Sequence, residues 1–220
     1  MYKTQQIIDA ITSQGMLPLY FNADEQVSIE ILRALYRAGV RTMEFTNRGE
    51  EAMSNFKKLV EVKNAEMPDA IIGIGTIKNL HQAKIYLDAG AAFLVSAGYD
   101  GDVAAYCTKH DIFYGPGCMT PTEIQAAENA GVKFVKLFPG NMLGPTFMAG
   151  IKDIFPKMVF MPTGGVDTTR ESIEGWYQSG VSAVGMGSKL VSKKLMHAKD
   201  YAGIEKIAAE VLAIIQSIRN

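Results

Sequence analysis

A short unit recurs along the chain and limits the folds that are open to it. Four amphipathic stretches each end in a small residue and a glycine, and an apolar run begins directly afterwards. The four junctions are Ala38-Gly39-Val40, Ala89-Gly90-Ala91, Ala130-Gly131-Val132 and Ser179-Gly180-Val181. A glycine just past the end of a helix can adopt the left-handed backbone conformation that closes the last turn. The repeat therefore predicts helix-to-strand connections of the kind found in βαβ units.

Eight apolar runs supply the strands for this pattern. Each run is short and poor in charge, as expected of strands that are buried on both faces. The predicted strands are Leu17–Phe21, Arg41–Thr46, Ala70–Gly75, Ala92–Ser96, Ile112–Gly115, Lys133–Phe138, Met158–Pro162 and Ser182–Met186. Their number and their spacing of roughly 20–30 residues are typical of a closed parallel barrel.

We therefore expect an α/β fold of the (β/α)8 TIM barrel class, with residues 1–220 forming one domain. An extra helix around Ile7–Ile11 precedes the first strand, and another over Ile204–Ile218 follows the last. The helix expected near Met142–Ile154 is the weakest, because Gly144-Pro145 interrupts it.

A doubly wound open sheet is the rival architecture. Such a sheet normally carries a glycine-rich loop after its first strand. Residues 21–24, which stand at that position, contain no glycine, so the barrel is favoured.

Charge and cysteine content exclude several classes of function. The 22 Lys and Arg are scattered among 23 Asp and Glu, so no basic face for a nucleic acid is evident. Cys107 and Cys118 lie in no metal-ligand spacing, which indicates free thiols in a reducing compartment. The N-terminus is too polar for a signal peptide, and no run approaches the roughly 18 apolar residues of a membrane span. We expect a cytoplasmic protein with no membrane or nucleic-acid partner.

A lysine stands in the middle of the sixth predicted strand. By alternation, Lys136 shares a face with Phe134 and Phe138, whereas Lys133 lies at the entrance of the strand. An amine that is desolvated in an apolar barrel has a lowered pKa and becomes available as a nucleophile. Such an amine can condense with a ketone to give an iminium ion. Taken alone, Lys136 could equally pair with an acid or extend out of the barrel mouth.

The second predicted strand carries polar residues of one parity. Glu44, Thr46 and Arg48 project to the same side and step towards the C-terminal mouth, where barrel enzymes place their chemistry. A carboxylate near an iminium-forming lysine can shuttle protons, and an arginine can hold a substrate carboxylate through two hydrogen bonds. A structural ion pair is the alternative, but the set as a whole favours catalysis.

Glycine-rich strand ends predict an anion site. The seventh and eighth strands end in Pro162-Thr163-Gly164-Gly165 and Gly185-Met186-Gly187-Ser188. In many barrels these two loops, together with a helix N-terminus, bind phosphate through backbone N–H groups. Thr76, after Gly75, offers a further hydroxyl at the mouth. The three histidines are widely spaced and Glu44 has no evident second carboxylate, so we expect neither a metal nor a cofactor.

The assembled residues resemble the 2-keto-3-deoxy-6-phosphogluconate / 4-hydroxy-2-oxoglutarate (KDPG/KHG) aldolase family. The resemblance runs from Leu17 to about Leu190 and rests on an ordered set of motifs. They are Glu44-Phe45-Thr46-Asn47-Arg48, Gly73-Ile74-Gly75-Thr76, Pro116-Gly117, Lys136-Leu137-Phe138-Pro139, Pro162-Thr163-Gly164-Gly165 and Gly187-Ser188.

The resemblance implies a class I aldolase that needs no metal. Lys136 would form the Schiff base and Glu44 would be the general acid/base; Arg48 and Thr76 would hold the pyruvate carboxylate, with Pro116 near it. Substrate binding by Thr163, Gly164, Gly165, Gly187 and Ser188 would include the phosphate. The reaction would cleave the phosphorylated keto acid to pyruvate and glyceraldehyde 3-phosphate, or 4-hydroxy-2-oxoglutarate to pyruvate and glyoxylate, in a homotrimer.

Departures from the family pattern leave the aldehyde half of the substrate open. Ala97 stands where proline is usual, the first strand is unusually aromatic and lacks a basic residue, and Gly140 replaces a common alanine. A 2-keto-3-deoxy-6-phosphogalactonate aldolase is therefore an alternative. Two others are a non-catalytic phosphosugar-binding barrel, with Glu44 and Lys136 as a structural ion pair, and a phosphate-barrel isomerase or epimerase with a carboxylate or metal pair.

Overall fold

The computed structural model describes residues 2–219, in which helices and parallel strands alternate. The helices are α1 (Thr4–Gln14), α2 (Glu25–Arg37), α3 (Ala52–Glu66), α4 (Leu80–Asp88), α5 (Gly101–His110), α6 (Pro121–Asn129), α7 (Gly140–Ile151), α8 (Arg170–Gln178), α9 (Lys193–His197) and α10 (Tyr201–Arg219). The strands are β1 (Met16–Tyr20), β2 (Thr42–Thr46), β3 (Ile71–Gly75), β4 (Leu94–Val95), β5 (Tyr114–Gly115), β6 (Gly117–Cys118), β7 (Phe134–Leu137), β8 (Val159–Pro162) and β9 (Val184–Met186).

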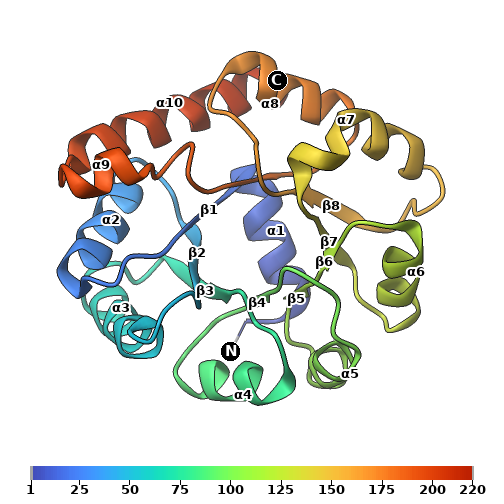
Figure 1. Ribbon diagram of the computed structural model, residues 1–220, viewed down its shortest axis with the longest axis horizontal. Coiled ribbons are helices and arrows are strands. Elements are labelled where there is room, and N and C mark those ends of the chain that lie inside the picture. The colour runs from blue at the N-terminus through green and yellow to red at the C-terminus, as the bar shows by residue number, and fades with distance from the viewer. Residues whose placement is uncertain (1, 220) are drawn as a thin grey trace.

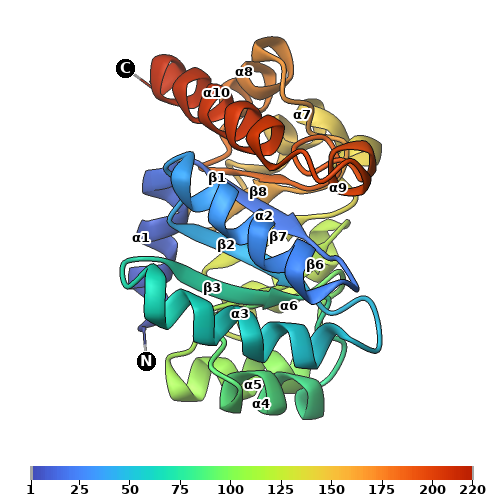
Figure 2. The ribbon, with the colours of Figure 1, turned by 90° about the vertical axis from the view of Figure 1, so that its left-hand side faces the viewer.

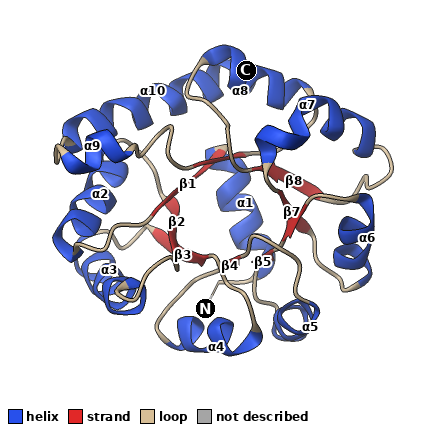
Figure 3. Ribbon diagram, viewed as in Figure 1, coloured by secondary structure: helices blue, strands red, loops and turns tan. Residues whose placement is uncertain are grey.

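All the strand pairings are parallel, and the strands form two sheets. One sheet has the order β5-β4-β3-β2-β1-β9, and the other has the order β6-β7-β8. A bridge between Thr163 and Gly185 connects the ends of β8 and β9, and the Ser182 amide donates to the Phe160 carbonyl at 3.1 Å. The strands surround the interior and most of the helices lie outside them (Figures 1 and 3). The α/β expectation is confirmed.

The fifth predicted strand, Ile112–Gly115, differs from the structure. Its last two residues form β5, and a further short strand that was not predicted, β6, follows after Pro116. Proline has no backbone N–H and interrupts a strand ladder. As a result β5 pairs with β4, whereas β6 pairs with β7. One extended segment thus passes from the first sheet to the second at Pro116.

The interior of the strand arrangement is filled by aromatic and aliphatic side chains. Phe113 packs edge-on against both Phe93 and Phe134, with ring centroids 5.8 and 5.0 Å apart. Helix α1 lies at the N-terminal ends of the strands (Figure 2), and its Ile7 and Ile11 belong to the same buried cluster. A larger cluster lies between the strands and the outer helices. The polar site must therefore lie towards the C-terminal ends of the strands.

Gln14, at the end of α1, fixes the N-terminal ends of two strands. Its side-chain oxygen accepts hydrogen bonds from the Arg41 and Thr42 amides at 2.6 and 3.0 Å. Its side-chain nitrogen donates to the Met16 and Thr42 carbonyls at 2.7 and 2.8 Å. The side-chain amide of Gln14 therefore provides hydrogen-bond partners for backbone groups at the start of the strands.

The predicted helix-to-strand junctions are confirmed. Gly39, Gly90, Gly131 and Gly180 all have φ between 80° and 101°. The weak helix is confirmed as well, since Gly144 breaks α7 with φ 71° and ψ 167° just before Pro145. Within residues 2–219, no helix combines the length and apolar character needed to cross a bilayer.

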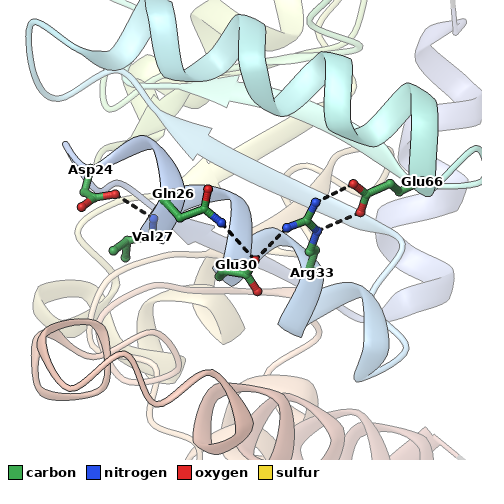
Figure 4. Close-up of polar contacts among 6 residues, drawn as sticks. All are labelled: Asp24, Gln26, Val27, Glu30, Arg33 and Glu66. Atoms are coloured by element: carbon green, nitrogen blue, oxygen red, sulfur yellow. Dashed lines mark hydrogen bonds and ion pairs between the residues drawn. The ribbon is translucent and has the colours of Figure 1, made fainter.

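Ion pairs between outer helices occur at the surface. The α2 helix begins at its N-cap Asp24, whose carboxylate accepts from the Val27 amide at 2.9 Å. Further along α2, Arg33 pairs with Glu30 at 2.7 Å and reaches Glu66 of α3 (Figure 4). Pairs this exposed contribute about 0–1 kcal/mol each, so packing of the apolar faces holds these helices in place.

Candidate active site

Glu44 of β2 and Lys136 of β7 point into the interior from different sheets. On β2, the neighbours Met43 and Phe45 face the outer helices, so Glu44 faces inward. On β7, Phe134 belongs to the interior cluster, and Lys136 has the same parity. Glu44 is 0% exposed and Lys136 is 3% exposed. The structure therefore confirms that the predicted lysine is kept out of water.

Gly75 of β3 makes room for the Glu44 carboxylate. A Cβ atom built on Gly75 would overlap this carboxylate and would lie 2.9 Å from its Cγ. No other residue type could stand beside Glu44 without moving it. The glycine before Thr76 thus has a steric role that the motif alone did not reveal.

The Glu44 carboxylate is buried without a hydrogen-bond partner. Neither of its oxygens is bonded among the described residues, and no ion pair within 4.0 Å joins it to Lys136 there. Burial raises the pKa of Glu44, and the positive charges of Lys136 and Arg48 oppose that rise. A structural Glu44–Lys136 ion pair, which the non-catalytic alternative requires, is therefore not formed.

The amine of Lys136 is shifted towards its neutral form. Burial lowers its pKa, while the charge of Glu44 opposes the shift and that of Arg48 adds to it. Its Nζ lies 5.3 Å from the centroid of the Phe138 ring. A neutral amine beside a carboxyl with a raised pKa provides a nucleophile and a proton carrier in one dry site.

A cavity of about 190 Å³ lies at the ends of β8 and β9. It brings together six of the predicted site residues, which are Arg48, Thr163, Gly164, Gly165, Gly187 and Ser188. Gly164 and Gly165 have φ of 95° and 75°, a region that L side chains rarely adopt. The Thr163 hydroxyl is buried there and has no hydrogen-bond partner among residues 2–219. The cavity thus offers cationic, hydroxyl and exposed backbone groups.

The starts of the two helices that follow the β8 and β9 loops are not among the residues that line the cavity. The α8 helix begins at Arg170 and α9 at Lys193. After β9 the chain forms a turn in which the Leu190 amide donates to the Gly187 carbonyl at 2.9 Å. The lining itself therefore offers loop backbone groups and side chains to an anion.

Thr76 and Pro116 are not part of the cavity lining. Thr76 follows Gly75 at the C-terminal end of β3 and has φ 63°, which is unusual for a residue with a Cβ. The Pro116 carbonyl accepts a hydrogen bond from the Lys136 amide at 2.9 Å. Both residues therefore lie beside the strands that carry Glu44 and Lys136.

Several lining residues were missed at the sequence level. Leu19, Phe138, Val166 and Lys189 border the cavity. Lys189 directly follows the Gly187-Ser188 pair, so its position in the chain was a usable signal. Its Nζ lies 2.9 Å from the carboxylate of Asp167. Within residues 2–219, no three His, Cys, Asp or Glu side chains are grouped so that they could hold a metal ion.

Comparison with known proteins gives matches over most of the chain. A family described as KDPG and KHG aldolase matches residues 7–207. The 2-dehydro-3-deoxy-phosphogluconate aldolase of Treponema pallidum is 30% identical over 213 residues, which cover 95% of this chain and 97% of that protein. The KHG/KDPG aldolase of Escherichia coli K12 is 30% identical over 203 residues, which cover 92% of each protein.

One solved structure with the same fold is a KDPG aldolase from Legionella pneumophila, with pyruvate captured as a covalent carbinolamine intermediate. Its TM-score against this chain is 0.84 at 24% identity, and the match covers 92% of this chain and 96% of that one.

Proposed function

Because the chain belongs to the KDPG and KHG aldolase family, whose members are carbon–carbon lyases, we propose that it is a Schiff-base aldolase that releases pyruvate from 4-hydroxy-2-keto acids. The substrate is 2-keto-3-deoxy-6-phosphogluconate, 4-hydroxy-2-oxoglutarate, or both. The observation that carries this proposal is that Lys136 and Glu44 are both buried in the interior, where each influences the pKa of the other, and that the Glu44 carboxyl has no hydrogen-bond partner among the described residues.

The reaction begins at the amine. Neutral Lys136 adds to the C2 ketone of the substrate, and loss of water from the carbinolamine gives an iminium ion. A base then removes the C4 hydroxyl proton, the C3–C4 bond breaks, and its electron pair neutralises the iminium as an enamine. The aldehyde leaves. Protonation at C3 and hydrolysis release pyruvate and restore the amine.

Glu44 is the proton carrier of these steps. It takes the C4 hydroxyl proton and returns a proton to C3, directly or through a water molecule. Its burial supports this role, because burial raises the pKa of the carboxyl towards neutral pH. A group whose pKa lies near the working pH can both accept and donate a proton.

The two ends of the substrate are held by different groups. Arg48 and Thr76 bind the pyruvate carboxylate, with Pro116 beside it. Thr163, Gly164, Gly165, Gly187 and Ser188 bind the aldehyde half, including its phosphate. The cavity that these last five residues share with Arg48 supports the assignment.

The same proposal covers the finer architecture. We infer a closed (β/α)8 barrel formed by residues 1–220 as one domain, with β5 and β6 counting as a single strand. Three copies associate in the cytoplasm. The 2-keto-3-deoxy-6-phosphogalactonate reaction is the main alternative, because its substrate differs in stereochemistry but carries the same reacting groups.

Borohydride trapping tests the proposal. Incubation with pyruvate and borohydride should add the mass of one reduced pyruvate adduct, which peptide mapping should assign to Lys136. The variant Lys136→Met should form no adduct. Lys133→Met is the matched control, because Lys133 is exposed at the start of the same strand, and it should be labelled normally. A folded wild-type protein without an adduct would refute the proposal.

The substrate is decided by a coupled lactate dehydrogenase assay. The gluconate- and galactonate-derived phosphorylated keto acids and 4-hydroxy-2-oxoglutarate are compared by their kcat/KM values. A higher value for the galactonate compound would favour the alternative.

A further inference from the structure

An ion pair connects the two glycine-rich loops at the edge of the cavity. Asp167 follows Gly164-Gly165 after β8, and Lys189 follows Gly187-Ser188 after β9. The Lys189 Nζ lies 2.9 Å from the Asp167 carboxylate. Neither residue is part of the motifs on which the family resemblance rests.

The two partners differ in how firmly they are held. Asp167 is fixed by its own backbone surroundings, because its carboxylate accepts from the Thr168 amide at 2.7 Å and its amide donates to the Ser172 hydroxyl at 3.0 Å. Lys189 has a long side chain that is 56% exposed and has no other ion-pair partner among the described residues. Lys189 is therefore the partner that is free to move.

The residues that line the cavity carry positive charge and no negative charge. Among the residues that line it, Arg48 and Lys189 are the cations, and no carboxylate is present. Asp167 lies at the edge, outside the lining. Thr163 also lines the cavity, and its buried hydroxyl has no hydrogen-bond partner among residues 2–219. This combination points to an anionic ligand.

A phosphate monoester carries a charge of about −1.5 to −2 near pH 7. Since Arg48 is assigned to the substrate carboxylate, the backbone amides and hydroxyls of the two loops supply no full positive charge to balance it. The mobile ammonium of Lys189, which lines the cavity, can supply a positive charge for the phosphate. The carboxylate that holds this ammonium carries a single charge, and a dianion competes with it favourably.

We propose that Lys189 is a phosphate-binding residue that leaves Asp167 when a phosphorylated substrate enters the cavity. This inference rests on the proposed aldolase function and adds to it a source of selectivity. Asp167 holds the ammonium at the cavity edge when the site is empty. Lys189 thereby favours phosphorylated over unphosphorylated keto acids.

The first experiment compares Lys189→Met with the wild type on two substrates. The ratio of kcat/KM for 2-keto-3-deoxy-6-phosphogluconate to kcat/KM for 4-hydroxy-2-oxoglutarate should fall about tenfold, the effect expected of one charge-assisted contact. Lys189→Arg should restore most of the ratio. Lys193→Met is the matched control, because Lys193 is exposed on nearby α9 and does not line the cavity.

The second experiment measures competitive inhibition by inorganic phosphate. Lys189→Met should weaken inhibition about tenfold. Asp167→Asn should strengthen it about threefold, because the anion no longer competes with a carboxylate for the ammonium. If both variants weaken inhibition by phosphate equally, the ion pair acts as a structural link between the loops. The proposal that Lys189 leaves Asp167 to bind phosphate is then refuted.

Failure of this inference differs from failure of the proposed function. If the wild type forms a pyruvate adduct on Lys136 but Lys189→Met keeps the wild-type substrate ratio, the aldolase stands and the phosphate role of Lys189 is wrong. If no adduct forms and inorganic phosphate still binds in a Lys189-dependent manner by calorimetry, the anion site stands and the aldolase is wrong.

Discussion

Substitution of Gly75 by alanine tests how closely the site depends on the position of the Glu44 carboxylate. The new Cβ would overlap the carboxylate and lie 2.9 Å from the Glu44 Cγ, well inside ordinary contact. Glu44 is fully buried, so the acid must move by on the order of 1 Å or more against packed neighbours. A displacement of about 1 Å can reduce a rate by about 10²-fold, and we expect that loss in kcat.

Stability should fall much less than activity. Overpacking of a buried position costs about 1–3 kcal/mol, so the variant should still fold. Urea unfolding followed by circular dichroism measures this cost, and the lactate dehydrogenase assay measures kcat. Gly98→Ala is the matched control, since a Cβ there meets no atom within 4 Å. A folded Gly75→Ala protein with wild-type kcat would show that the position of Glu44 does not limit the reaction.

Three further predictions concern charge and packing. Burial raises the pKa of Glu44 above its usual value of 4.5. Between the usual and the raised pKa, the folded protein keeps the Glu44 proton and the unfolded chain releases it. The free energy of unfolding of the wild type therefore falls as pH rises through this range. Glu44→Gln removes this loss, so its urea midpoint relative to wild type should increase from pH 4 to 7, and an unchanged difference would contradict the burial argument. Gln14→Ala, which removes four hydrogen bonds to strand backbones, should lower the free energy of unfolding by about 2–4 kcal/mol in urea titrations, and a loss below about 1 kcal/mol would refute its role. Arg33→Ala should cost no more than about 1 kcal/mol by the same titration and leave kcat unchanged, because its ion pairs are exposed.

Much of the fold is visible in the sequence because strand burial and glycine turns are local properties. The predicted β2 and β8 strands end at the residues that the structure gives, Thr46 and Pro162. The predicted Ala92–Ser96 strand is longer than β4, but backbone hydrogen bonds continue the pairing, since the Ala92 amide donates to Ile72 and the Ser96 amide to Gly115. These differences lie at the ends of elements, where ladder geometry is irregular.

The strand that follows Pro116 was not predicted. The predicted fifth strand ends at Gly115, as β5 does, but Gly117–Cys118 forms the additional strand β6. Which sheet each of these strands would join depends on the register of neighbouring strands, and no local pattern contains that information.

The site could be predicted as far as residue type and parity allow. Alternation places Lys136 and Glu44 inward, which the structure confirms. The overlap between Gly75 and Glu44 could not be predicted, because it depends on the register between β2 and β3. The Asp167–Lys189 pair was also missed, since it joins side chains of two loops whose approach is decided by tertiary folding.

The passage of the chain from one sheet to the other at Pro116 has a consequence for the distance between acid and amine. Glu44 belongs to the six-stranded sheet and Lys136 to the three-stranded one, so no continuous ladder of hydrogen bonds runs from one to the other without crossing a seam. Residues at the two seams, Pro116 on one side and the Thr163–Gly185 bridge on the other, therefore help to set the position of one sheet relative to the other. Substitutions at the seams could thus change the distance between the Glu44 carboxyl and the Lys136 amine while both reacting groups stay the same.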